Sequence, residues 1–176
     1  MDFTHVDRTF ELSCLCASAG RPVFVGTTMR MEADPDTLRK IAIDIPILCA
    51  PNVTRGAATL LGILEGFARR LGPNYDVKVL GLHHRTKKEV PSGTSREMAR
   101  RIRTGRGDDA PPEIAIVLAG GTYGIHEALF AGPNHEIRIT HTVTRPDIDN
   151  SVLRAGLDWL MTNSAGFYGI SEVLAE

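Results

Sequence analysis

The sequence predicts an α/β fold, with a parallel sheet in the first part of the chain and a mixed sheet in the second. Short apolar runs alternate with amphipathic stretches up to residue 71, and four β-rich runs with one helical stretch among them follow. Alternation of strands and helices is typical of parallel sheets, because a crossover between parallel strands needs a long connection, usually a helix. The 176 residues, of which 43% are hydrophobic, are enough for one ordinary domain or for two small lobes that share a core.

The first elements follow from apolar runs and from the residues that end them. Residues 1–4 resemble the end of a strand, and the later elements are expected as helices at 6–19, 36–42 and 56–71 and as strands at 22–25 and 45–50. Gly20 ends the first helix, and Pro51 ends the second of these strands. In the long helix Leu60, Leu64 and Leu71 recur at helical spacing, which predicts one buried face.

The second part of the chain is expected to be richer in strands. The predicted strands are 76–83, 114–118, 123–130 and 136–143, with a helix at 94–102, a loop at 105–112 and a closing helix at 147–161. Residues 132–135, Gly-Pro-Asn-His, are expected to form a hairpin turn between the last two strands. In the last strand Ile137, Ile139 and His141 alternate with polar residues, so we expect one of its faces to be buried.

Charge and cysteine content argue against several classes of function. The net charge is −1, from 20 basic and 21 acidic side chains, so the chain has no global field that would attract nucleic acid or an anionic membrane. It contains no signal-peptide core and no long apolar run. Cys14, Cys16 and Cys49 lie in apolar contexts and lack zinc or disulfide spacing, so they are expected to be buried free thiols. These observations predict a cytoplasmic protein without a nucleic-acid or membrane partner.

The strongest functional signal is the segment 83–94, which reads His-His-Arg-Thr-Lys-Lys-Glu-Val-Pro-Ser-Gly-Thr. It places two imidazoles, a guanidinium and two ammonium groups within six residues, directly before the expected N-terminus of a helix. The first amides of a helix are unpaired and attract negative charge, so the segment offers proton donors next to an anion site. This combination predicts a site for a small substrate that carries carboxylates. The alternative is a solvated basic loop with one packed histidine.

The other histidines are open to more than one interpretation. Neighbouring strand residues point to opposite faces, so only one of His83 and His84 is expected to be central. His126 and His141 stand on later strands and are interpreted as hydrogen-bonded partners in a half-buried sheet. A zinc site made by His83, His126 and His141 is conceivable, but no H-x-x-x-H or carboxylate-supported pattern exists, so no metal is predicted. His135 is expected on the surface.

The segment 83–94 resembles the signature of the dihydrodipicolinate reductase family, whose members reduce a cyclic dicarboxylate with a nicotinamide cofactor. The resemblance covers essentially the whole chain, because five further segments match the family's motifs in order. These are Asp2-Phe3-Thr4, Gly26-Thr27-Thr28, residues 50–56 (Ala-Pro-Asn-Val-Thr-Arg-Gly), residues 124–127 (Gly-Ile-His-Glu) and residues 136–141 (Glu-Ile-Arg-Ile-Thr-His). The resemblance implies a tetramer built by packing mixed sheets together, and a C-terminal helix that returns to the first lobe.

The resemblance also implies roles for individual residues. His83 would be the proton donor and Lys87 the second acid or carboxylate ligand, and these two are the predicted catalytic residues. The predicted substrate-binding residues are His84, Arg85, Ser92, Gly93, Thr94, Asn52 and Thr28. The cations of Arg85, Lys87 and Lys88 are expected to lower the pKa of His83 while the site is empty, and an incoming carboxylate would raise it again.

The sequence also departs from the family pattern. The family's glycine-rich dinucleotide loop should precede Asp2, and no G-x-G-x-x-G occurs in the chain. Met29, Thr86 and Leu118 stand where the family often has glycine, histidine and arginine. We therefore expect a truncated Rossmann-like lobe at residues 1–50, completed by 146–176, and a mixed-sheet α+β lobe for substrate binding and oligomerisation at 51–145. No cofactor is expected to bind.

Loss of the dinucleotide loop favours chemistry that needs no cofactor. The first hypothesis is a cofactor-independent acid–base enzyme, a cyclase, dehydratase or isomerase of a small or polyketide-like metabolite in specialised metabolism. The first alternative is a reductase of a cyclic dicarboxylate or imine, in which a partner chain supplies the dinucleotide-binding half. The second alternative is a ligand-binding or assembly subunit without catalysis. A homotetramer is expected in each case, with a dimer as the runner-up.

Overall fold

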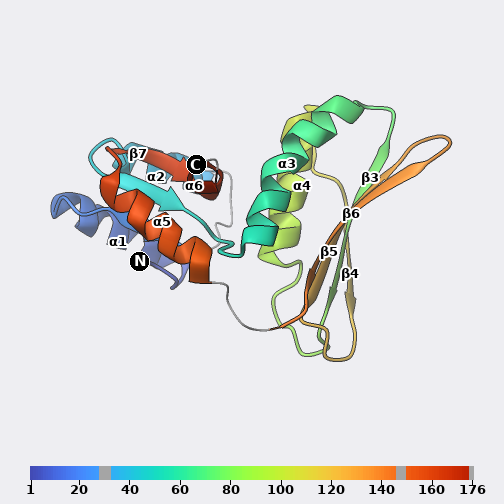
Figure 1. The fold of residues 1–176 in the computed structure, drawn as a ribbon, viewed down its shortest axis with the longest axis horizontal. Helices are drawn as coiled ribbons and strands as arrows, with labels where there is room; N and C mark the ends of the chain where they lie inside the picture. The colour runs from blue at the N-terminus through green and yellow to red at the C-terminus, as the bar shows by residue number, and fades with distance from the viewer. Residues whose placement is uncertain (28–32, 146–149, 175–176) are drawn as a thin grey trace. The chain divides into compact units, whose positions relative to one another are not determined.

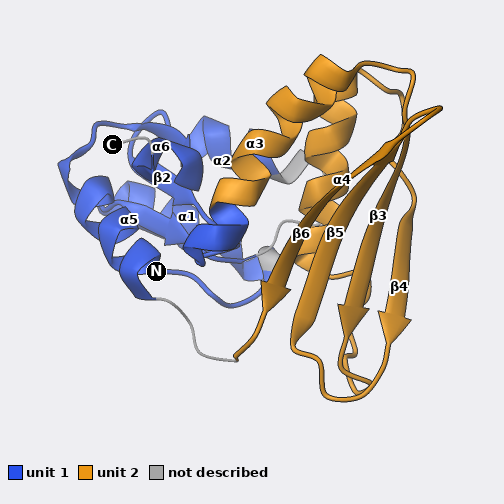
Figure 2. Ribbon diagram, turned by 45° about the vertical axis from the view of Figure 1, so that its right-hand side comes forward, with its two compact units in different colours: residues 1–58, 148–176 blue, residues 59–147 orange. Residues whose placement is uncertain are grey.

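The computed structural model describes residues 1–27, 33–145 and 150–174, which form two compact units. Unit 1 comprises Met1–Ala58 and Ile148–Glu176, and unit 2 comprises Thr59–Asp147 (Figure 2). Each unit has a sheet and helices of its own, whose order along the chain can be followed in Figure 1. The mixed α/β fold predicted from the sequence is confirmed.

Unit 1 is built on a three-stranded parallel sheet. Its strands are β1 (Val23–Val25), β2 (Pro46–Cys49) and β7 (Gly166–Gly169), in the order β1-β2-β7. Its helices are α1 (Val6–Ser18), α2 (Ala33–Ile41), α5 (Asn150–Thr162) and α6 (Ile170–Leu174). The sequence pattern did not predict β7 and α6, because Gly-Phe-Tyr-Gly is short and shows neither helical nor strand periodicity. The predicted start of α5 at residue 147 lies outside the described residues.

Both faces of the unit 1 sheet are covered, which explains why its strands read as continuous apolar runs. Val23, Val25 and Ile47 pack on one side, in a cluster with residues of α1 and α2. Phe24 and Leu48 pack on the other side, with residues of α5 and α6. The strand alternation of the backbone thus divides the apolar residues between two cores.

Unit 2 contains a four-stranded mixed sheet in the order β4-β3-β5-β6. Its strands are β3 (Asp76–His83), β4 (Ile114–Leu118), β5 (Gly124–Ala131) and β6 (Glu136–Val143). β3 runs parallel to β4 and antiparallel to β5, and β5 pairs antiparallel with β6. Three of the four strands have the predicted bounds, and β5 is displaced by one residue at each end. The hairpin turn between β5 and β6 is confirmed by the hydrogen bond from Gly132 N to His135 O.

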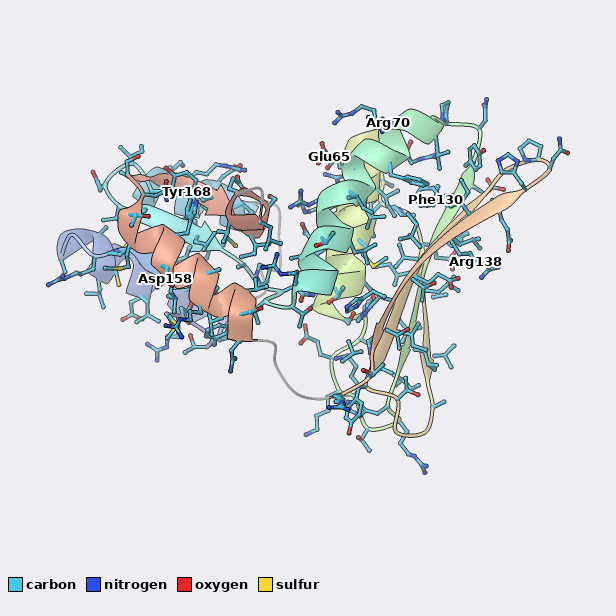
Figure 3. All side chains as sticks on the ribbon, in the orientation of Figure 1. Glu65, Arg70, Phe130, Arg138, Asp158 and Tyr168 are labelled. Carbon is cyan, nitrogen blue, oxygen red and sulfur yellow. The ribbon has the colours of Figure 1, made fainter. Side chains whose placement is uncertain are left out.

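Two helices, α3 (Arg55–Leu71) and α4 (Gly93–Arg106), cover one face of this sheet (Figures 1 and 2). Phe130 is fully buried beneath them and meets the ring of Phe67 edge to face, with 5.2 Å between the ring centroids. Figure 3 shows Phe130 on the helix side of the sheet and Arg138 on the other side. No helix of unit 2 covers that second face among the described residues, and Val117 there is 57% exposed.

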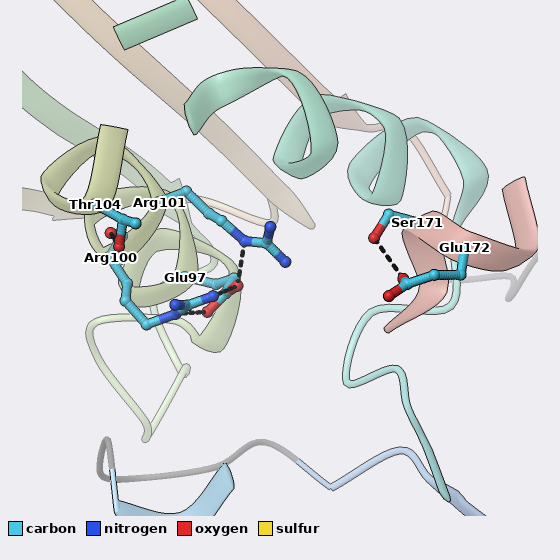
Figure 4. Close-up of polar contacts among 6 residues, drawn as sticks. All are labelled: Glu97, Arg100, Arg101, Thr104, Ser171 and Glu172. Atoms are coloured by element: carbon cyan, nitrogen blue, oxygen red, sulfur yellow. Dashed lines mark hydrogen bonds and ion pairs between the residues drawn. The ribbon is translucent and has the colours of Figure 1, made fainter. Parts of the chain in front are cut away.

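Helix α4 extends to Arg106, beyond the loop expected from residue 105, and ends at Gly107 in the left-handed conformation (φ 72°). Glu97 stabilises the middle of the helix, because its carboxylate accepts hydrogen bonds from Arg100 (2.7 and 2.6 Å) and Arg101 (2.8 Å; Figure 4). Burial alone would raise the pKa of Glu97, but these arginines outweigh it and lower the pKa. Because α4 continues to Arg106, Gly105 is a helix residue and not a loop residue.

The place of Gly105 in the helix follows from its contact with α3. A side-chain Cβ at Gly105 would lie 2.2 Å from the backbone oxygen of Glu65, far inside contact distance. Glycine is thus required where the two helices approach most closely, at the cost of a lower helix propensity. A sequence pattern that treats glycine as a helix breaker cannot detect such a requirement.

Gly105→Ala is expected to lower the free energy of unfolding by about 1–3 kcal/mol, because the added methyl forces the helices apart. Gly66→Ala is the matched control: it lies on α3, an added Cβ meets nothing within 4 Å, and alanine should stabilise the helix by up to about 1 kcal/mol. Urea denaturation followed by circular dichroism measures both changes. Equal stabilisation by the two substitutions would contradict the close contact.

The cysteines correct one expectation from the sequence. Cys14 is exposed and Cys16 and Cys49 are half-buried, so the three free thiols are not buried as predicted. Cys14 lies in a helix with an apolar neighbourhood in sequence, but the helix presents that residue outward. Within residues 1–27, 33–145 and 150–174, no helix is long and apolar enough to cross a membrane.

Candidate active site

His83 occupies the end of β3 on the helix-covered face of the unit 2 sheet. Val79 and Gly81 precede it on the same face, and the His83 side chain is only 3% exposed. His84 follows on the opposite side of the chain and is half-buried, as the alternation of strand residues predicts. His84 instead hydrogen-bonds Thr86, with 2.9 Å between Nδ1 and Oγ1.

Two glycines provide the space for buried imidazoles in this sheet. Gly81 pairs across the strands with His126, and Gly124 begins β5 beside His83. A Cβ at Gly124 would lie 3.3 Å from Nδ1 of His83 and 3.3 Å from Cε1 of His126. Because both glycines lack side chains, the two rings can occupy the surface of the sheet that larger residues would fill.

The imidazoles of His83, His126 and His141 form a row across three strands. The ring centroids of His83 and His126 are 5.1 Å apart, and those of His126 and His141 are 5.8 Å apart. Three of their buried nitrogens, Nε2 of His83 and Nδ1 of both other rings, have no hydrogen-bond partner among the described residues. The interpretation of His126 and His141 as hydrogen-bonded sheet partners is therefore wrong at these atoms, because the neighbours that the sheet supplies are glycine and other imidazoles.

Burial and positive charge keep the imidazole of His83 neutral in the absence of a ligand. Burial is the larger cause of its lowered pKa, followed by the ammonium group of Lys87, while a hydrogen bond with the backbone of Tyr123 opposes both. The sequence predicted the direction of this pKa shift and the contribution of Lys87. It did not predict that burial would outweigh the charges.

The first turn of α4 lies beside His83. Ser92 caps the helix, since its hydroxyl accepts a hydrogen bond from Ser95 N at 3.1 Å. Ser95 is fully buried, and a Cβ at Gly81 would lie 3.3 Å from Oγ of Ser95 and 3.4 Å from Nε2 of His83. The structure thus places the N-terminus of the helix, which begins at Gly93, next to the unpartnered nitrogen of His83.

Hydrogen bonds and an ion pair hold the loop between β3 and α4 at both of its ends. Arg85 N donates to Gly120 O at 3.1 Å at the start of the loop. At its end, Arg96 of α4 forms an ion pair with Glu89 and donates to Pro91 O at 2.6 Å. These contacts hold a loop whose side chains are largely solvated, and Arg85 itself is exposed.

Lys87 is the half-buried cation of this loop. Its ammonium group lowers the pKa of both His83 and His126, which places its charge close to the row of imidazoles. Lys87 makes no ion pair within the part of the chain that the structure describes. Its charge is therefore available to a ligand.

The remaining predicted substrate-binding residues are divided between the two units and the part of the chain that is not described. Asn52 belongs to unit 1, where its Oδ1 accepts hydrogen bonds from Thr54 N (3.4 Å) and Thr54 Oγ1 (3.1 Å). Thr28 and Met29 lie outside the described residues. Thr94 is the second residue of α4, so its backbone belongs to the helix N-terminus beside His83.

Residues 1–27, 33–145 and 150–174 contain no group of three or more His, Cys, Asp or Glu side chains arranged to hold a metal ion. Sequence reasoning missed Gly81, Gly124 and Ser95 as parts of the site. The register of the antiparallel strands would have revealed the two glycines, because it sets each of them beside a histidine.

Sequence comparison assigns the chain to a family. A family model described as "Dihydrodipicolinate reductase, C-terminus" matches residues 56–174, and a 4-hydroxy-tetrahydrodipicolinate reductase of Hahella chejuensis (strain KCTC 2396) is 33% identical over 99% of this chain and 72% of its own length. The chain belongs to the dihydrodipicolinate reductase family. A 4-hydroxy-tetrahydrodipicolinate reductase of Syntrophus aciditrophicus (strain SB) is 29% identical, with the same coverage.

A solved structure agrees with the fold of this dihydrodipicolinate reductase relative. It is described as dipicolinate-bound dihydrodipicolinate reductase from Paenisporosarcina sp. TG-14, and it matches with a TM-score of 0.69 over 97% of this chain and 71% of that chain. The sequence identity is 20%, so the match supports the architecture of the two units. The family resemblance inferred from the motif at 83–94 is confirmed.

Proposed function

We propose that this member of the dihydrodipicolinate reductase family is an enzyme that binds a small carboxylate-bearing substrate beside His83 and transfers a proton there. The observation that carries the proposal is the buried Nε2 of His83, which has no partner among the described residues and lies next to the first turn of α4. The positive end of the helix dipole and the ammonium group of Lys87 suit a carboxylate.

The mechanism follows from the lowered pKa of His83. In the empty site, burial and Lys87 keep the ring neutral, so it can accept a proton. A carboxylate that binds beside it neutralises the field of Lys87 and raises the pKa, and the protonated ring then acts as a general acid. The N-terminus of α4, with its positive helix dipole, and the Lys87 ammonium stabilise negative charge that develops on the substrate.

Within this class, we favour a reaction without a cofactor: cyclisation, dehydration or isomerisation of a small or polyketide-like metabolite in the cytoplasm. These reactions need proton transfer and charge stabilisation, which His83, Lys87 and the start of α4 supply together. Lys87 makes no ion pair among the described residues, and an available charge beside a buried imidazole also favours catalysis over a binding-only role.

Two residues of the segment Gly26-Thr27-Thr28, which resembles a family motif, make contacts within unit 1. Gly26 is covered by the ring of Phe3, whose Cε1 lies 2.1 Å from the position of a Cβ. Thr27 is buried, and its hydroxyl donates to the carboxylate of Asp2 at 3.2 Å. The proposed reaction therefore uses the residues beside His83 and none of this segment.

A second candidate function is reduction of a cyclic dicarboxylate or imine by NADH or NADPH, with the dinucleotide-binding half on a partner chain. It is favoured by the two relatives that are named 4-hydroxy-tetrahydrodipicolinate reductases, at 33% and 29% identity. Both candidates use the same carboxylate site. They differ in whether a hydride donor takes part: the reductase needs NADH or NADPH, whereas the cofactor-independent reaction needs proton transfer alone.

Calorimetric titration of the purified chain with dipicolinate, NADH and NADPH tests the proposal. We expect dipicolinate to bind, and we expect neither nucleotide to bind at concentrations on the order of tens of micromolar. Lys87→Met should weaken dipicolinate binding, and Lys78→Met on the same unit is the matched control because Lys78 pairs with Glu113 at the far end of β3. Failure of dipicolinate to bind would refute the carboxylate site, and low-micromolar binding of either nucleotide would favour the reductase.

We also propose that the chain forms a homotetramer through the sheet face of unit 2 that no helix covers. Leu80, Ile125 and Leu129 lie on this face, because their neighbours along each strand are the buried residues of the helix side. An uncovered apolar face is an association surface, and closed symmetry is the usual result. Light scattering should give four times the chain mass of 19.2 kDa.

Leu129→Lys should reduce this mass, whereas Ile63→Lys, on an exposed position of α3, should leave it unchanged. A mass near that of one chain for the unmodified protein would show that the sheet face does not mediate association.

A further inference from the structure

The row of imidazoles contains more ionisable groups than a single proton donor needs. His126 is 6% exposed and contacts the rings of both His83 and His141, yet the proposed reaction uses only His83. Nδ1 of His126 and Nδ1 of His141 have no hydrogen-bond partner within the described residues. Buried polar atoms without partners are rare and point to a function or to a missing ligand.

We propose that His83, His126 and His141 act as one proton-accepting unit, in which two neighbouring rings are never charged together and which takes up one proton when a carboxylate binds beside His83. His126 is the positioning residue of this unit, because it lies between the other two rings and separates them. The inference rests on the proposed carboxylate site, and it adds that binding there is coupled to the uptake of one proton.

The contacts between the rings limit each pair of neighbouring rings to one proton. Adjacent centroids are 5.1 and 5.8 Å apart, and a second positive charge in direct contact with the first would be strongly disfavoured in a buried site. The central ring is affected most, since burial and then the charges of His83, His141 and Lys87 lower the pKa of His126 to about 4. The proton therefore resides on one of the two outer rings.

The charged groups around His126 reinforce this limit. From β3 it faces His83, from β6 it faces His141, and from the loop after β3 it faces Lys87. The carboxylate of Glu127, its neighbour on β5, lies on the opposite sheet face and accepts from Arg138 at 2.7 Å. The carboxylate of Glu97 on α4 is paired with Arg100 and Arg101, as described above. Among the described residues, no carboxylate thus offsets the positive charges, and a bound anion would be the first to do so.

The coupling can be measured without any ligand by nuclear magnetic resonance of ¹⁵N-labelled histidines. We expect His126 to stay neutral down to about pH 5, and its pKa to rise by about one unit in His83→Asn and in Lys87→Met, because each removes one repelling charge. Lys87→Met changes a loop residue and keeps the buried rings, so it serves even where the His83 variant does not fold. His135→Asn, at the exposed hairpin tip, should leave the titration unchanged. A His126 titration that is the same in all variants would overturn the inference.

Calorimetry of dipicolinate binding in buffers with different ionisation enthalpies counts the protons that are taken up. We expect close to one proton per chain near neutral pH. Binding without uptake, or with uptake of two or more protons, would overturn the inference and leave the carboxylate site intact. Absence of binding would refute the proposed function, and the ligand-free titration would then decide whether the three rings are coupled.

Discussion

Replacement of His83 or Lys87 by alanine is expected to lower turnover of the natural substrate by about 10²-fold or more, the usual effect of losing a positioned acid or a charge stabiliser. His83→Ala removes the buried imidazole beside the start of α4, and with it the group that moves the proton in the proposed reaction. Lys87→Ala removes the cation of the loop that acts on that imidazole. Steady-state kinetics with the natural substrate measures the loss. Until that substrate is identified, a metabolite extract that contains it takes its place.

The control for this experiment is His135→Ala. His135 is exposed at the turn between β5 and β6. Its ring contacts the ring of Tyr75, and its Nε2 lies 2.6 Å from the Tyr75 hydroxyl oxygen. Its replacement should leave turnover unchanged. If the His83 and Lys87 variants fold normally and keep full activity, the segment 83–94 is only a solvated basic loop.

The free energy of unfolding is expected to fall by about 3 kcal/mol between about pH 7 and pH 4 because of His126 alone. The folded state holds the pKa of this ring at about 4, whereas the unfolded chain protonates it near its ordinary value of about 6.5. Between these values the unfolded state binds more protons, so acid favours unfolding. The stabilisation is fully present above the unfolded pKa and is lost as the pH falls toward the folded one. His83 and His141, whose pKa values are also lowered by burial, act in the same direction.

His126→Leu removes the titrating group and keeps an apolar side chain of similar size. The pH dependence of urea unfolding should be shallower in this variant by the amount stated, whereas His135→Leu should retain the full slope. Equal slopes in the unmodified protein and in His126→Leu would show that the folded state does not disfavour the protonated ring.

The sequence allowed much of the fold to be predicted because local signals agree with it. β3 ends at His83 as predicted, since the apolar run stops where the charged loop begins. α4 begins at Gly93, one residue from the predicted start, because Ser92 is a strong N-cap. Strand alternation correctly separated His83 from His84. Each of these features depends on residues that are close together in the chain.

The features that escaped prediction depend on contacts between distant residues. Gly105 belongs inside α4 because of the backbone of Glu65, forty residues earlier. The row of imidazoles arises from strand register, which sets His126 opposite both Gly81 and His141. Neither the helix contact nor the strand register can be predicted from the order of strands and helices along the chain. For the same reason, the prediction that His126 and His141 are hydrogen-bonded in the sheet was wrong at their Nδ1 atoms.

The contacts of Arg96 connect the loop after β3 with the helix that follows it. Arg96 belongs to the first turn of α4, and through Glu89 and Pro91 it ties that turn to the loop that carries Lys87. The segment that carries Lys87 and the start of α4 are therefore joined by contacts of a single side chain, Arg96. A change that removes Arg96 would alter the support of both anion-binding elements at once.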